Sequence, residues 1–139
     1  MQLTRLDGVK VLFVDDRRDA RFVVHHILKD AGAAVTLSEN GLQAVELMNG
    51  SASECPFHVV VMDVNMPVLD GLSATRQIRS QGHLLPILAL TAGAMKEDQE
   101  ECLRAGCNGY MRKPIDGIRL VETIHQLAFA ERPLQSSAG

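Results

Sequence analysis

Residues 59–71, VVVMDVNMPVLDG, contain a buried strand, a polar strand end and the start of a helix. The apolar run from Val59 to Met62 is typical of a strand that is buried on both faces of a parallel sheet. Asp63 ends this run, and Asp70 has the type of side chain that caps the helix predicted to begin at Gly71. The segment therefore predicts a strand, a short loop and a helix, with a carboxylate at the strand end.

The same alternation of strand and helix extends in both directions along the chain. The predicted strands are Val9 to Val14, Ala34 to Leu37, His58 to Met62, Pro86 to Leu90 and Gly109 to Met111. Segments with the apolar spacing of helices are residues 20–31, 41–48, 71–80, 96–105 and those after Asp116. This order predicts an α/β fold, a single doubly wound five-stranded parallel sheet with five helices.

Two of the predicted helices differ in how firmly they should be held. The first has a full inward stripe: Ala20, Val23, Val24, Ile27, Leu28 and Ala31. The fourth is polar from 97 to 101, EDQEE, which leaves Cys102 and Leu103 as its clear apolar anchors. We therefore expect the fourth helix to be weakly held.

Composition limits the classes of function. The 139 residues are 46% hydrophobic and 22% charged, as in an ordinary globular domain. We expect residues 1–130 to form one domain and residues 131–139 to be a flexible tail or linker stump. The net charge of -3 gives no basic excess for nucleic acid, and no apolar run is long enough to span a membrane.

Location and redox state follow from the same composition. The first residues lack an apolar signal core, so the prediction is a cytoplasmic protein. Cys55, Cys102 and Cys107 lack a CxxC spacing, which indicates free thiols rather than a zinc site.

Polar residues follow the predicted strands at the edge where ligands bind in open parallel sheets. These residues are Asp15, Asp16, Asp63, Asn65, Thr91 and Lys113. Three carboxylates packed together repel one another, and a divalent cation relieves that repulsion. Ligands that are all oxygen favour Mg²⁺ or Mn²⁺. The Lys113 amine and the Thr91 hydroxyl could then hold a phosphoryl group on or near Asp63.

Four motifs in chain order carry a family resemblance: Val14-Asp15-Asp16, MDVNMPVLDG at 62–71, Leu90-Thr91-Ala92 and YMRKP at 110–114. Together they resemble the receiver domain of two-component response regulators over roughly residues 8 to 128. The resemblance implies a flavodoxin-like (βα)5 fold. Residues 89–98, ALTAGAMKED, are most similar to receivers of hybrid sensor histidine kinases.

The resemblance also implies a role for each site residue. Asp63 would take a phosphoryl group from a phosphohistidine on a histidine kinase or a histidine phosphotransfer protein, with Mg²⁺ as cofactor. Asp16 and Asp63 would bind the metal directly, Asp15 largely through water, and Asn65 through its backbone carbonyl. Lys113 would pair with Asp63 at rest, and the peptide bond before Pro114 would be cis.

The resemblance further implies a switch. Thr91 would move to the phosphoryl group, and the ring of Tyr110 would fill the space that Thr91 leaves. The surface from Thr91 to Tyr110 would change with it. Two departures from the family stand near this site: Arg17 and Arg18 after the acidic pair, and Gly93, which has no side chain to orient or block water.

Other readings of the same residues stay open. Asp15, Asp16 and Asp70 could cap helices. Asp63-Val64-Asn65 partly resembles the Asp-x-Asp motif of haloacid-dehalogenase-like enzymes, so a small Mg²⁺-dependent phosphatase with Asp63 as nucleophile is the alternative function. A receiver-fold interaction domain that no longer accepts phosphate is a third class. The preferred interpretation is a signalling module and not an enzyme, of undetermined oligomeric state.

Overall fold

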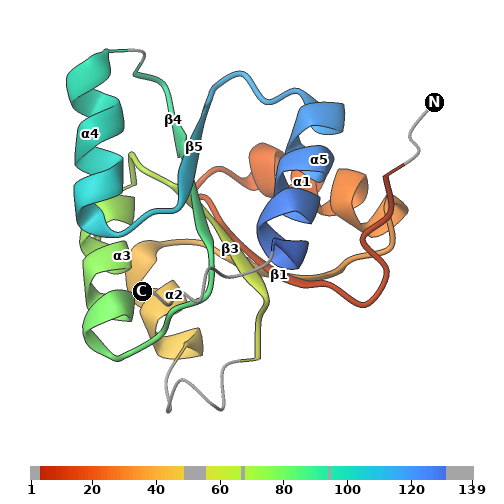
Figure 1. Cartoon of the computed structure of the whole chain (residues 1–139), viewed down its shortest axis with the longest axis horizontal. Coiled ribbons are helices and arrows are strands. Elements are labelled where there is room, and N and C mark those ends of the chain that lie inside the picture. The colour runs from red at the N-terminus through yellow and green to blue at the C-terminus, as the bar shows by residue number, and fades with distance from the viewer. Residues whose placement is uncertain (1–3, 49–55, 67, 94, 131–139) are drawn as a thin grey trace.

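The computed structural model describes residues 4–48, 56–66, 68–93 and 95–130, and these residues form a single parallel sheet with helices on both faces (Figure 1). The strands are β1 Lys10–Val14, β2 Ala34–Ser38, β3 Val59–Asp63, β4 Ile87–Thr91 and β5 Gly109–Arg112. Their order across the sheet is β2-β1-β3-β4-β5. This is the flavodoxin-like order, so the predicted doubly wound fold is confirmed.

In the described ranges of the chain, five helices cover the two faces of the sheet. They are α1 Arg18–Asp30, α2 Gly41–Leu47, α3 Gly71–Ser80, α4 Lys96–Ala105 and α5 Gly117–Phe129. Helices α1 and α5 lie on one face, and α2, α3 and α4 lie on the other (Figure 1). The predicted number and order of the helices are confirmed.

Alternate residues of the central strands belong to two separate hydrophobic cores, one on each face of the sheet. Val60 and Met62 of β3 pack under α2, α3 and α4, whereas Val59 and Val61 pack under α1 and α5. All five residues of β3 are buried. Two-sided burial explains why this strand has a continuous apolar run instead of an alternating one.

The predicted inward stripes of α1 and α4 are partly wrong. Val23 is 52% exposed, while Val24 beside it is 1% exposed. In α4, Leu103 is 51% exposed, and the buried residues are Cys102 and Ala105. In both helices the buried stripe is narrower than the apolar pattern, so an apolar residue about 100° around the helix from a buried neighbour is exposed.

Most strand ends also differ from the predicted ones, in each case by one residue. The observed strands β3 and β4 continue to Asp63 and Thr91, so these polar residues belong to the sheet itself. Strand β2 is an edge strand and is largely exposed, unlike the fully buried central strand β3. Cys102 and Cys107 are buried and have free thiols. Cys55 and the predicted tail at 131–139 lie outside the described residues.

Within the described part of the chain, each helix is too short or too polar to cross a membrane.

Candidate functional site

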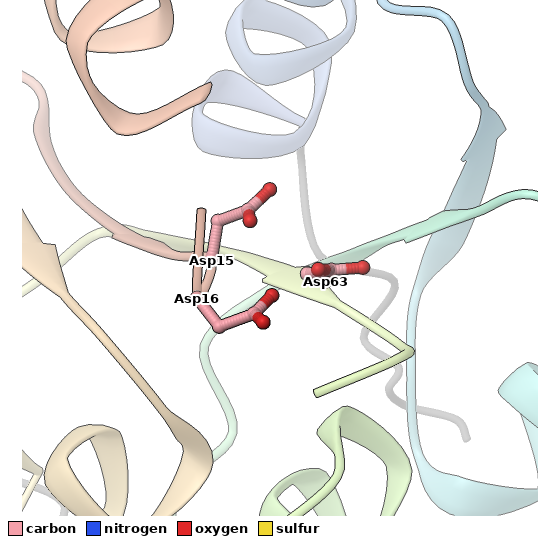
Figure 2. A group of neighbouring side chains, drawn as sticks. All are labelled: Asp15, Asp16 and Asp63. Carbon is pink, nitrogen blue, oxygen red and sulfur yellow. The ribbon is translucent and has the colours of Figure 1, made fainter. Parts of the chain in front are cut away.

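The ends of β1 and β3 bring three carboxylates together (Figure 2). Val14 of β1 is paired with Met62 of β3, so the residues that follow, Asp15 and Asp63, reach the same edge of the sheet. One carboxylate oxygen from each of Asp15, Asp16 and Asp63 lies within 4.8 Å of the other two. The sequence-based prediction that these residues converge is confirmed.

Lys113 joins this acidic group from the segment after β5. Its Nζ donates to Oδ1 of Asp63 at 2.9 Å, and its side chain is 19% exposed. The backbone N–H of Lys113 donates to the carbonyl of Thr91, and the Lys113–Pro114 peptide bond is cis. Asn65 contributes its backbone N–H, which donates to the same Asp63 oxygen at 3.2 Å.

Among the residues that the structure describes, one oxygen of each buried carboxylate has no hydrogen-bond partner. Oδ2 of Asp15 and Oδ2 of Asp63 are both buried and unpaired. Burial raises the pKa of Asp15, and the nearby Asp63 carboxylate raises it further. Two orphaned carboxylate oxygens beside the exposed Asp16 form an all-oxygen donor set, which fits a hard divalent cation such as Mg²⁺.

Thr91 and Tyr110 occupy different environments. Thr91 is 5% exposed, and its Oγ1 accepts a hydrogen bond from the Gly93 backbone N–H at 3.0 Å. Tyr110 is 38% exposed, and its hydroxyl donates to Oε1 of Gln99 at 3.0 Å. The ring of Tyr110 is therefore in an outward position, and the Gln99 contact was not anticipated from the sequence.

The two departures from the family have structural consequences. Nε of Arg17 lies 3.8 Å from Oδ1 of Asp15, so a guanidinium does reach the acidic site. A side chain at Gly93 would overlap the carboxylate of Asp98 from α4. The space beside Gly93 is therefore filled by another residue, which the sequence did not indicate.

The helix-cap reading holds for one of the three aspartates. Oδ1 of Asp70 accepts from the Ser73 backbone N–H at 2.9 Å and caps α3, and this bond lowers the pKa of Asp70. Helix α1 begins after Arg17 and has no side-chain cap, so Asp15 and Asp16 do not cap it.

Two positioning residues were missed by the sequence analysis. Nη1 of Arg21 donates to the backbone carbonyl of Asp15 at 2.8 Å. Gly71 packs so closely on Asp63 that a side chain there would overlap the Asp63 carbonyl. The Asp70-Gly71 pair was a usable signal for Gly71, since glycine has no Cβ and permits a close backbone approach.

Comparison with known proteins assigns the family. The family model of the response regulator receiver domain matches residues 11–125. The chain therefore belongs to the response regulator receiver domain family. Probable histidine kinase 2 from Oryza sativa subsp. indica is 37% identical over 134 residues, which cover 86% of this chain and 13% of the kinase.

Solved structures are similar over the same region. The receiver domain of sensor histidine kinase PA1611 from Pseudomonas aeruginosa, which has a magnesium ion coordinated in its active-site cleft, is 38% identical with a TM-score of 0.77. The similarity covers 87% of this chain and 98% of that chain. The Saccharomyces cerevisiae Ssk1 receiver domain, crystallised with the histidine phosphotransfer protein Ypd1, is 28% identical with a TM-score of 0.79, covering 88% and 90%.

These comparisons confirm the predicted resemblance to receivers of histidine kinases. They favour the receiver interpretation over the phosphatase alternative.

Proposed function

We propose that this receiver domain takes a phosphoryl group from a phosphohistidine onto Asp63. The observation that carries the proposal is the state of the Asp63 carboxylate. It is 1% exposed, one oxygen is bound by the Lys113 amine, and the other is unpaired beside two further acids. A desolvated carboxylate with an unpaired oxygen is suited to nucleophilic attack on phosphorus.

The side chains around Asp63 would have different roles in the phosphoryl transfer. In the transfer, an Asp63 oxygen forms a bond to phosphorus as the bond to the donor histidine nitrogen breaks. The Lys113 amine offsets charge on the transferred phosphoryl oxygens, and the Thr91 hydroxyl donates to one of them. Asp15, Asp16, Asp63 and the Asn65 carbonyl would hold Mg²⁺, which offsets negative charge on the phosphoryl oxygens when bound. Mn²⁺ would be an alternative ion for the same oxygen donors.

The partner we propose is a histidine kinase or a histidine phosphotransfer protein. The Ssk1 receiver in its complex with Ypd1 and the receiver of PA1611 support this class of partner. The receiver would comprise residues 1–130. We further propose a cytoplasmic location, as the sequence predicts.

The test is the intact mass of the chain after incubation with acetyl phosphate and Mg²⁺. We expect one added phosphoryl group, lost on treatment with hydroxylamine because the product is an acyl phosphate. Asp63→Asn should abolish it. Asp70→Asn is a matched control, because it changes an aspartate that caps α3 outside the acidic group. No labelling would support an interaction domain that no longer accepts phosphate, and sustained turnover of an aryl phosphate would support a phosphatase.

A further inference from the structure

We propose that Gln99 is a positioning residue for Tyr110: its side-chain amide keeps the ring outward and so sets how often the switch is on without phosphate. The inference rests on the proposed function, because it concerns the Thr91 and Tyr110 surface of the same site. It adds a residue on α4 whose role follows from contacts in this chain.

The hydrogen bond between Tyr110 and Gln99 explains why the ring is outside. The hydroxyl lies 3.0 Å from Oε1 of a half-buried Gln99, and Tyr110 is 38% exposed. A tyrosine ring gains free energy when its apolar face is buried. A good acceptor on the outer side opposes that gain and favours the exposed position.

A second position for the ring is available next to Thr91. A cavity of about 380 Å³ that opens to the surface is lined by Thr91, Gly93, Gln99 and Tyr110, together with residues of β5, of α5 and of the segment between them. This volume lies within the range of sites that hold small ligands, so one phenol ring fits. A ring that enters the cavity leaves its present bond to Gln99, so the hydrogen bond and the burial of the ring oppose each other.

The same hydrogen bond links α4 to the sheet. The buried residues of α4 are Cys102 and Ala105, both in its last turns. Gln99 lies about one turn earlier and is bonded to β5 through Tyr110. Loss of this bond therefore removes one of the contacts that hold the first turns of α4, and it also frees the ring.

Phosphorylation would act on this equilibrium from the other side. A phosphoryl group on Asp63 attracts the Thr91 hydroxyl, and movement of Thr91 enlarges the space for the ring. The strength of the hydrogen bond to Gln99 sets how strongly the phosphoryl group must favour the inward ring. A hydrogen bond of ordinary net strength corresponds to about a 2- to 10-fold change in the ratio of inward to outward rings.

The sequence provides a direct probe, because Tyr110 is the single tyrosine and the chain has no tryptophan. The experiment measures acrylamide quenching of tyrosine fluorescence in the whole chain, without Mg²⁺ or phosphate analogue. Gln99→Leu keeps the size of the side chain and removes the acceptor, and Gln99→Glu keeps an acceptor as the matched control. We expect quenching of Gln99→Leu to fall toward the value of the wild type with Mg²⁺ and beryllofluoride, whereas Gln99→Glu stays near the wild type without them.

A second measurement uses the linkage between ligand and conformation. If the inward ring favours the phosphoryl mimic, the beryllofluoride concentration for half-maximal change should fall by the same factor of about 2 to 10 in Gln99→Leu. Equal quenching of wild type and Gln99→Leu, in proteins with the same far-ultraviolet circular dichroism, would overturn the inference. Gln99→Ala gives the same comparison if the leucine variant does not fold.

The two proposals fail in different ways. If beryllofluoride changes the wild type but Gln99→Leu matches it in both measurements, the role of Gln99 is wrong and the proposed function stands. If beryllofluoride has no effect on any variant, the Thr91 and Tyr110 switch is wrong, and the intact mass after acetyl phosphate decides the proposed function separately. The ligand-free comparison then still decides the role of Gln99.

Discussion

Nζ of Lys113 lies 2.9 Å from Oδ1 of Asp63. The lysine side chain is 19% exposed, and the aspartate side chain is 1% exposed. The pair joins the end of β3 to the segment after β5, across the intervening strand β4. Because the carboxylate is almost fully desolvated, its negative charge depends on this amine for compensation. The chemistry of the site and the stability of the fold therefore depend on the same contact.

Removal of the amine should destabilise the protein. We expect Lys113→Met to lower the free energy of unfolding by about 1 to 3 kcal/mol at pH 7, less than for a fully buried pair because the lysine is partly exposed. In an Asp63→Asn background the same change should cost less than about 1 kcal/mol, since the buried charge that the Lys113 amine contacts has been removed. Urea unfolding of the four proteins measures this coupling. Equal costs in both backgrounds would show that the pair is not energetically coupled.

The acidic group should give the metal-free protein a characteristic pH dependence. The pKa of Asp15 is raised above its ordinary value of 3.8 by burial, so the folded state binds more protons than the unfolded state between these two pKa values. Stability from this residue is therefore present below about 3.8 and is lost as the pH rises through the raised pKa. We expect Asp15→Asn, which can keep the bond from Arg17 N–H, to be more stable than the wild type at pH 7 by about 0.5 to 1 kcal/mol. The difference should shrink as the pH falls toward 4 in thermal melts with chelator, and a difference that grows on acidification would contradict this explanation.

Magnesium should stabilise the wild type through the same residues. A ligand that binds only the folded state raises stability by about 2.7 kcal/mol at one hundred times its dissociation constant. We expect the melting temperature of the wild type to rise with Mg²⁺ and that of the Asp15→Asn, Asp16→Asn double variant to stay flat. Added NaCl at matched ionic strength controls for screening. An equal rise in both proteins would place the cation elsewhere.

Gly71 should be required for the position of Asp63. A Cβ at Gly71 would overlap the Asp63 carbonyl oxygen and approach the Met62 side chain, so the loop before α3 must move. We expect Gly71→Ala to cost about 1 to 3 kcal/mol in denaturant unfolding and to reduce labelling of Asp63 by acetyl phosphate. Gly109→Ala is the control, because its Cβ would meet only an ordinary contact with Leu88 at 3.6 Å. If both variants behave alike, close packing at Gly71 does not position the carboxylate.

Hydrogen exchange should separate the two faces of the sheet. With Mg²⁺ and beryllofluoride we expect protection to change from Thr91 to Tyr110, which includes α4 with its two buried residues, and to change little in α1. Changes concentrated in α1 would contradict the assignment of the switch.

The order of the elements and the polar residues at the strand ends can be predicted from the amino-acid sequence. Continuous apolar runs mark β3 and β4, and parallel strands end at one edge, so the residue pattern suffices to assign Asp15, Asp63 and Thr91 to that edge. The Asp70 cap is also predictable, because a cap is a local hydrogen bond within one turn.

Contacts that depend on packing between distant elements are defined only in the folded chain. The exposure of Val23 and Leu103 follows from how each helix is rotated on the sheet, and a sequence pattern does not define that rotation to within one residue. Asp98 beside Gly93 and Gln99 on Tyr110 both depend on where α4 lies relative to the sheet. The buried face of a helix is predicted from the spacing of its apolar residues. Helix α4 has few apolar residues, so its sequence says little about how it lies on the sheet.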